Sequence, residues 1–173
     1  MKTLGVGKVF QEVRKKHCSQ LQFALDNNIV RESVSAYETE RARLPQDISR
    51  KAIQRFDSPR LAFEVASQYT GGSWLTWLDG NNVDLHRASV RSKVKEELRE
   101  ALDAIAEVSL ANHPHAMQDF ERRKLEHSIE QSIDAIYALS MYVARVCEDY
   151  GYSWQRKWDK HRQKLVARRY VKA

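Results

Sequence analysis

The sequence predicts an all-α protein, and three observations lead to that expectation. Good helix formers (Ala, Leu, Glu, Arg, Lys and Gln) dominate the composition. Only six glycines and three prolines occur in 173 residues, so the chain has few places to turn sharply. Apolar residues recur three and four positions apart, which is the period of one helix face. A hydrophobic fraction of 42% can supply a core, so we expect one large or two small helical domains.

Five short helices are expected in residues 1–69. One face of the first, which ends near position 16, is marked by Val6, Val9, Phe10 and Val13. The second covers 19–26 with Ser19 as its N-cap. Asn27 and Asn28 then predict a turn, because asparagine tolerates the left-handed conformation, and a third helix covers 30–39. Pro45 and Pro59 open the fourth and fifth helices, since proline is accepted at the first helical position.

Residues 70–84 are expected to link two domains. Thr70, Gly71 and Gly72 mark the boundary after the fifth helix. The stretch that follows is too apolar for a free linker, so we expect it to dock onto a domain or a partner chain. Its large apolar residues are Trp74, Leu75, Trp77 and Leu78.

Residues 85–173 are expected to form a helical hairpin and a last helix. The hairpin helices cover 85–110 and 114–150, and the sequence NHPHA separates them. The second carries a seam with the spacing of a coiled coil, made of Ile129, Ile133, Ile136, Ser140, Val143 and Cys147. After Gly151 the last helix turns an apolar stripe inward, made of Trp154, Trp158, His161 and Leu165.

Charge is distributed unevenly along the chain. Residues 1–70 carry twelve Lys/Arg against eight Asp/Glu, residues 71–153 nine against fourteen, and residues 154–173 eight against one. Basic ends around an acidic middle suggest contact with a polyanion, although a solvated basic surface would give the same pattern.

Cys18 and Cys147 form neither a disulfide framework nor a zinc pattern, so no metal or cofactor is expected. Without a signal-peptide pattern or an apolar span, we expect a cytoplasmic protein with no membrane partner.

The stretch QLQFALDNNIVRESVSAYET, residues 20–39, resembles the helix-turn-helix of the Xre/Cro/phage-repressor family. The matching positions are Ala24, Asn28, four locking residues (Phe23, Ile29, Val34 and Tyr37) and Arg14, which in the family pairs with the glutamate found here as Glu38. The resemblance covers about residues 5–68 and implies a five-helix, lambda-repressor-like domain. Two positions depart from the pattern: Asn27 replaces an aliphatic residue, and Val30 replaces a capping hydroxyl worth about 1 kcal/mol.

The resemblance implies that the chain binds double-stranded DNA in a sequence-specific manner. The third helix would read bases with Arg31, Glu32, Ser33, Ser35 and Ala36. Among them, Arg31 suits guanine, Glu32 the cytosine amino group and Ala36 the thymine methyl. Phosphates would be held by Ser19, Gln20 and Gln22 at the start of the second helix and by Arg41 and Arg43 after the third.

Residues 70–173 resemble, more loosely, the C-terminal part of regulators carried by phages and mobile elements of Firmicute bacteria. The cues include WLDGNNVDLHR and KEELREALDAI. A homodimer through the C-terminal helices is expected, since two copies could read palindromic half-sites about 34 Å apart. Repression is the expected mode, because occupying a promoter needs no further contact. A protein anti-repressor could be a further partner, and the basic last helix could either touch flanking DNA or face solvent.

Two other interpretations stay open. The chain could be a protein-interaction module, such as an antitoxin or a host-factor inhibitor, that keeps a vestigial helix-turn-helix. The glutamates of EELRE (96–100) with Glu130 and Asp134 also resemble the magnesium ligands of MazG-type nucleotide pyrophosphatases, although the later pair is spaced by four instead of three. No nucleophile–base arrangement stands out, and His113 and His115 have no Cys or Asp ligands nearby in the sequence. We therefore expect that the chain is not an enzyme.

Overall fold

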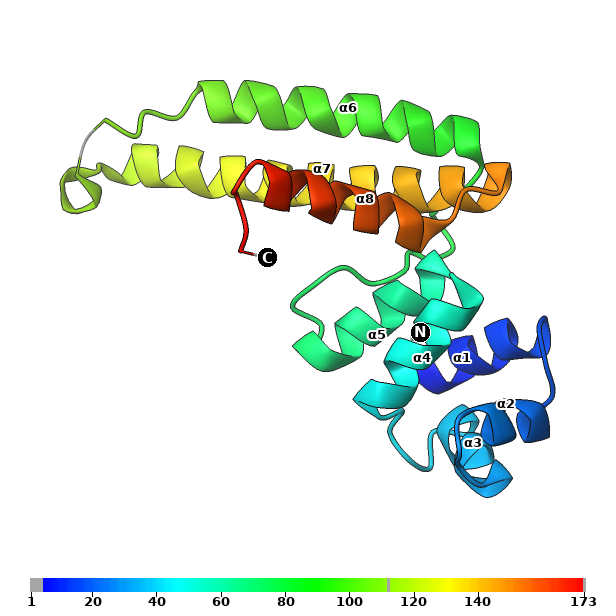
Figure 1. The fold of residues 1–173 in the computed structure, drawn as a ribbon. Coiled ribbons are helices and arrows are strands. Elements are labelled where there is room, and N and C mark those ends of the chain that lie inside the picture. Colours follow the sequence, from blue (N-terminus) through cyan, green and yellow to red (C-terminus); the bar gives the residue numbers. More distant parts are fainter. Residues whose placement is uncertain (1–4, 112, 173) are drawn as a thin grey trace. The chain divides into compact units, whose positions relative to one another are not determined.

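A computed structural model describes residues 5–111 and 113–172 (Figure 1). Every regular element among these residues is a helix, which confirms the all-α prediction. The chain divides into two compact units. The first contains Met1–Asn81 together with Tyr150–Ala173, and the second contains Asn82–Asp149.

Six helices make up the described part of the first unit. They are α1 (Val6–Lys15), α2 (Gln20–Asp26), α3 (Arg31–Glu38), α4 (Gln46–Phe56), α5 (Pro59–Thr70) and α8 (Trp154–Ala167). Helix α1 packs against α2 to α5, and α2 packs closely on α3. The core that joins α1 to α5 contains Val6, Val9, Phe10, Val13, Phe23, Ala24, Val34, Leu44, Ile48, Ala52, Phe56, Leu61 and Val65. The apolar spacing of the first helix is therefore confirmed as a core-facing stripe.

The ends of these helices follow local chemistry. The hydroxyl oxygen of Ser19 accepts from the backbone N–H of Gln22, and that of Ser58 accepts from Leu61. Asp57 ends α4 with φ of 48° and Gly71 ends α5 with φ of 63°, both in the left-handed region. The predicted caps and breaks are thus confirmed to within a few residues.

Gly7 lets α1 approach the end of α3. A Cβ atom built at this position would lie 2.1 Å from the carbonyl oxygen of Tyr37. That distance is shorter than any real contact, so only glycine fits there without moving a backbone. The position of α3 against α1 therefore depends on a residue without a side chain.

The apolar stretch after α5 docks onto the first unit. Leu75 and Trp77 are buried, and the ring of Phe63 contacts those of Trp77 and Trp154 at centroid distances of 5.8 and 5.6 Å. The carboxylate of Glu64 accepts from the backbone N–H of Trp77 at 3.1 Å. Trp74, by contrast, is exposed.

Helix α8 belongs to the first unit, whereas we expected residues 85–173 to form one domain. The backbone N–H of Gln155 donates to Asp57 at 2.8 Å, and its side-chain amide donates to the carbonyl of Ile53. Of the expected inward stripe, only Trp154 is buried, while Trp158 and His161 are exposed. The stripe is shorter than predicted because α8 makes these contacts through its first turn.

The second unit is built on two long helices that run side by side in opposite directions (Figure 1). They are α6 (Arg87–Ala106) and α7 (Asp119–Tyr150), with a short 3-10 helix, η1 (Pro114–Ala116), between them. Their buried residues are mostly small: Val90, Val94, Glu97, Ala101 and Ala104 on α6, and Ser128, Ala135, Met141, Ala144 and Cys147 on α7. The isoleucines of the predicted seam are exposed instead. Over the described residues, none of the helices combines the length and the apolar character needed to cross a membrane.

Candidate nucleic-acid interface

The turn between α2 and α3 holds the two helices close together. Asn28 adopts φ of 55°, which the sequence predicted for this turn. The backbone N–H of Ile29 donates to the carbonyl of Ala24 at 3.0 Å, and Ala24 itself is buried. The side-chain amide of Asn27 donates to the carbonyl of Phe23 at 2.8 Å. A buried amide therefore replaces the aliphatic residue expected at position 27 and meets a hydrogen-bond partner there.

A buried carboxylate anchors the inner side of α3. Glu38 pairs with the guanidinium of Arg14, as the resemblance implied, and both residues are at most 3% exposed. The amides of Gln20 and Gln11 donate to its second oxygen at 2.7 and 3.1 Å. Arg14 also donates to the carbonyl of Cys18 at 2.5 Å. One side chain of α3 is thereby bonded to α1 and α2 at once.

This network controls the ionisation of Glu38. Burial acts to raise the pKa of the carboxyl group, because a charge is poorly solvated in the core. Hydrogen bonds from Arg14, Gln20 and Gln11 favour the ionised form and together outweigh burial, so the pKa of Glu38 lies below its ordinary value. The charge is thus stable inside the fold, and it orients α3.

The outer side of α3 is open at its first turn. Arg31 and Glu32 are exposed, whereas Ser33, Ser35 and Ala36 are half-buried. Val30 precedes the helix, makes no side-chain capping bond and is 62% exposed. It was absent from the predicted site, although an exposed branched side chain beside Arg31 could contact a thymine methyl group. In the sequence, only the presence of valine where a capping Ser or Thr is usual could have pointed to this residue.

The three residues expected to hold phosphates on α2 all bond within the protein. Ser19 caps the helix, and Gln20 donates to Glu38. The amide of Gln22 donates to the carboxylate of Asp26 at 2.6 Å. Only Gln20 joins α2 to α3, whereas Ser19 and Gln22 bond within α2. The Ser19 hydroxyl accepts in its bond and keeps its own O–H to donate to a phosphate.

The two arginines after α3 differ in their surroundings. Arg41 is exposed, and its Nε donates to the hydroxyl of Thr39 at 3.0 Å. Arg43 donates to the carbonyl of Gln68 at 2.8 Å and lies over the ring of Tyr69, 4.7 Å from its centroid. Arg43 is thus held on the C-terminal end of α5, which leaves Arg41 as the less constrained of the two cations.

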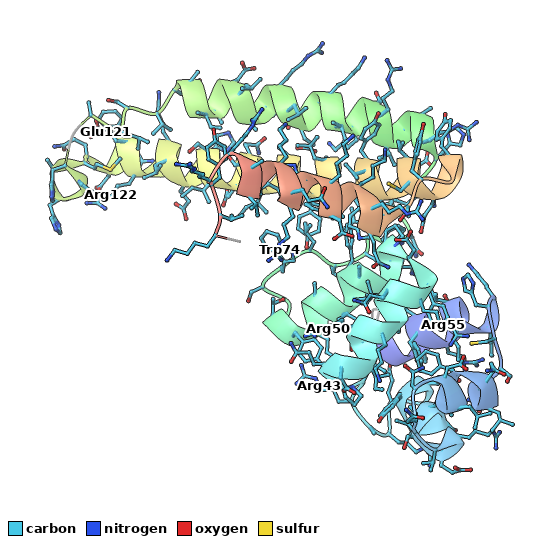
Figure 2. All side chains as sticks on the ribbon, viewed as in Figure 1. Arg43, Arg50, Arg55, Trp74, Glu121 and Arg122 are labelled. Atoms are coloured by element: carbon cyan, nitrogen blue, oxygen red, sulfur yellow. The ribbon has the colours of Figure 1, made fainter. Side chains whose placement is uncertain are left out.

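Helix α4 adds cations that sequence reasoning missed. Arg50 and Lys51 are exposed on α4, and Figure 2 shows Arg50 with Arg43 and Arg55 on the first unit. Arg55 is ion-paired with Asp26 of α2, and its guanidinium lies over the ring of Phe23 at 5.9 Å. Hydrogen bonds from Arg55 and Gln22 lower the pKa of Asp26. The charged sequence SRK (49–51) after the apolar Ile48 could have indicated this exposed face.

The acidic residues considered as magnesium ligands do not form a metal site in the described part of the chain. Lys93 bonds to Glu96 and Glu97 at 3.0 and 2.7 Å, while Glu130 and Asp134 are exposed on α7. No group of three His, Cys, Asp or Glu side chains that could hold an ion occurs among residues 5–111 and 113–172. His113 and His115 stack on each other with ring centroids 5.1 Å apart, and His113 Nδ1 accepts from the backbone N–H of His115 at 3.3 Å.

The first unit therefore presents a short, firmly held helix with a polar leading turn and exposed cations nearby. Such an arrangement can insert side chains into the major groove of a duplex while the rest of the unit touches phosphates. Comparison of the chain with protein-family models, with curated proteins and with solved structures gave no match.

Proposed function

We propose that the chain is a sequence-specific double-stranded DNA-binding regulator of transcription that uses a helix-turn-helix formed by α2 and α3. The observation that carries the proposal is the contrast between the two sides of α3. Its inner side is bonded to α1 and α2 through Glu38, and its leading turn exposes Arg31 and Glu32. A reading helix needs this combination, because base contacts discriminate only if the helix orientation is fixed.

The proposed roles divide between reading and holding. Arg31, Glu32 and Val30 would face base edges, and Arg41, Arg50 and Lys51 would contact the phosphate backbone. Ser33, Ser35 and Ala36 are half-buried. Their small side chains would let the helix approach the groove closely, without reading bases themselves. Repression by a dimer on a palindromic operator is the proposed mode, since one copy covers a single half-site.

In-vitro selection from a random duplex pool tests the proposal directly. We expect a two-fold-symmetric consensus and an affinity that falls as the salt concentration rises. Arg31→Ala should relax the preference at one base position at a cost of about 1–3 kcal/mol. Arg41→Ala should weaken binding to all duplexes alike and lower the salt slope by about one. Arg99→Ala, an exposed cation on α6, is the matched control and should change neither.

A protein-interaction module is the second candidate, and one observation favours it. Leu21, Leu25 and Val30 are each more than half exposed around the α2–α3 turn. Apolar side chains gain nothing from phosphates but are common in protein interfaces. Selection that enriches no sequence, combined with duplex binding insensitive to Arg31→Ala, would reject the DNA-reading function in favour of this candidate.

A further inference from the structure

The second unit has large aliphatic side chains that the described residues leave 44–67% exposed. On α6, Leu102 and Ile105 are 67% and 52% exposed, and on α7, Ile129, Ile133 and Ile136 are 54%, 49% and 44% exposed. Isolated exposed aliphatics are ordinary, but a continuous row of them marks an interaction site. The arrangement of these residues in space decides whether they form such a row.

Helix geometry places both stripes on one face of the hairpin. On α6, the stripe of Leu98, Leu102 and Ile105 lies roughly 100° around the helix from the buried stripe. The isoleucines of α7 are displaced from Ser128 and Ala135 by about the same angle in the same rotational sense. Because the helices run in opposite directions, equal rotations of the same sense bring both stripes to the same side. The other side is polar and carries Glu96, Glu100, Asp103, Glu130 and Asp134.

An ion pair gives the register of the two stripes. Lys124 Nζ lies 3.2 Å from Glu107 Oε2, which puts these two residues at about the same level along the hairpin. Counting from them along antiparallel helices, Ile105 is level with Glu126, Leu102 with Ile129, Leu98 with Ile133 and Lys95 with Ile136. The apolar face, defined here as Leu98, Leu102, Ile105, Ile129, Ile133 and Ile136, is therefore continuous across both helices.

The two ends of the apolar face carry opposite charges. Glu126 lies at the end near the α6–α7 connection, and Lys95 and Arg91 lie at the other end. Arg122 also lies near the connection (Figure 2), but it donates to the carbonyl of Pro114 at 3.1 Å and is directed toward that segment. The charges of Glu126, Lys95 and Arg91 are exposed and stay available to a partner.

We infer that the apolar face binds the same face of a second copy of the chain, with the two hairpins antiparallel in a four-helix bundle. Two adjacent stripes with spacings of three and four residues fit the ridges of another helix pair. A two-fold axis in the middle of the interface would stack α6 on α6 and α7 on α7, and would bring Glu126 of each copy to the same end of the bundle as Lys95 and Arg91 of the other. The charges at the two ends of the face are therefore complementary across the dimer. The inference rests on the second unit alone and does not require the proposed DNA-binding function.

Analytical ultracentrifugation of the full chain without DNA tests the inference. We expect a dimer, and Ile133→Asp should raise the dissociation constant by roughly 100-fold, because each dimer would bury two unpaired charges. His127→Asp, on the polar side of the same helix, is the matched control and should leave the dimer intact. Circular dichroism checks that both variants stay helical, which is expected because Ile133 is already 49% exposed and His127 is exposed in the single chain.

Charge reversal tests the orientation and the identity of the partner. Glu126→Lys alone and Lys95→Glu alone should each weaken self-association by about 10-fold, because like charges would face each other twice per dimer. Mixing the E126K chain with the K95E chain should restore association as a mixed dimer, since each then presents the charge that the other lacks. Within one hairpin these residues are not level, so an intrachain contact would not give this rescue.

The outcomes separate this inference from the proposed function. A full chain that remains monomeric at roughly 100 μM would overturn it, as would an Ile133→Asp chain that dimerises like the wild type. A dimer in ultracentrifugation together with failed duplex selection would leave the inference standing and reject the DNA-reading function. A monomer in ultracentrifugation together with a selected duplex consensus would reject the inference and leave the DNA-reading function standing.

Discussion

The α1–α5 part of the first unit and the α6–α7 hairpin bury different kinds of side chain. The first buries Phe10, Phe23 and Leu61 completely, whereas the hairpin buries alanines such as Ala101 and Ala135 and leaves Leu102 and Ile133 exposed. Burial stabilises a fold by about 25 cal/mol per Å² of apolar surface, so the two regions gain unequal amounts. The difference indicates that the α1–α5 part closes its core around large side chains, while the hairpin leaves several of its large aliphatic side chains exposed.

The largest expected difference comes from truncating one side chain in each region. Phe10→Ala should lower the free energy of unfolding by about 3–5 kcal/mol, because it opens a cavity in a closed core. Leu102→Ala should change it by less than about 0.5 kcal/mol in dilute protein, where the proposed pairing is absent. Denaturant unfolding followed by circular dichroism measures both. Equal losses would show that the hairpin has a core of its own after all.

Breaking one ion pair in each region should also separate them. Arg14→Ala leaves the Glu38 carboxylate buried without its charged partner and should cost about 3–5 kcal/mol. Lys93→Ala removes an ion-pair partner that is more than half exposed on α6 and should cost at most about 1 kcal/mol. Both values come from the same unfolding experiment. A small effect of Arg14→Ala would mean that Gln11 and Gln20 can hold the carboxylate by themselves.

Crowding Gly7 should have an intermediate effect. Gly7→Ala places a methyl group against the carbonyl of Tyr37 and should cost about 1–3 kcal/mol by pushing α1 from α3. Lys8→Ala, at the exposed next position, is the control and should stay within about 0.5 kcal/mol. If duplex binding depends on the orientation of α3, Gly7→Ala should weaken it more than Lys8→Ala does. Unchanged stability would show that the two helices can separate freely.

The smallest expected effect is the pH dependence of two buried glutamates in the first unit. The pKa of Glu38 is lowered from 4.5, so its contribution is present above that pH and is lost as the pH falls through the lower folded value. Burial outweighs the hydrogen bonds from Trp77 and Thr76 and raises the pKa of Glu64 above 4.5. Its ionisation therefore destabilises the fold as the pH rises from 4.5 through that raised value.

Substitution by glutamine should remove each slope separately. Glu38→Gln should flatten the loss of stability on acidification, and Glu64→Gln should flatten the opposite slope at higher pH. The measurement is the free energy of unfolding as a function of pH for the wild type and both variants. Identical profiles for all three proteins would contradict the assignment of these slopes to the two carboxyl groups.

The sequence predicted features that depend on neighbouring residues better than those that depend on distant ones. Ser19, Asn28 and Pro59 marked helix boundaries because caps and turns are local chemistry. The pairing of Arg14 with Glu38 came from a resemblance and is confirmed by the structure. The attachment of α8 through Gln155 and Asp57 joins positions 98 residues apart, and no local pattern indicates such a contact.

The candidate site was predicted only in outline. Polarity placed Val34 and Tyr37 inside and Arg31 outside, and in the structure Val34 is buried, Tyr37 is half-buried and Arg31 is exposed. The sequence could not show that Gln20 donates to Glu38 or that Arg43 lies over the ring of Tyr69, because the type of a polar residue does not reveal its partner. In the same way, the spacing of Ile129, Ile133 and Ile136 predicted a seam without indicating that the single chain leaves it exposed.

The return of α8 to the first unit makes the hairpin an insertion with two covalent tethers. The chain leaves that unit after Asn81 and re-enters it at Tyr150, through the end of the continuous helix α7. A force on the hairpin would therefore reach the first unit through two covalent connections instead of one. Excision of residues 82–149 with the ends rejoined should therefore leave a compact first unit.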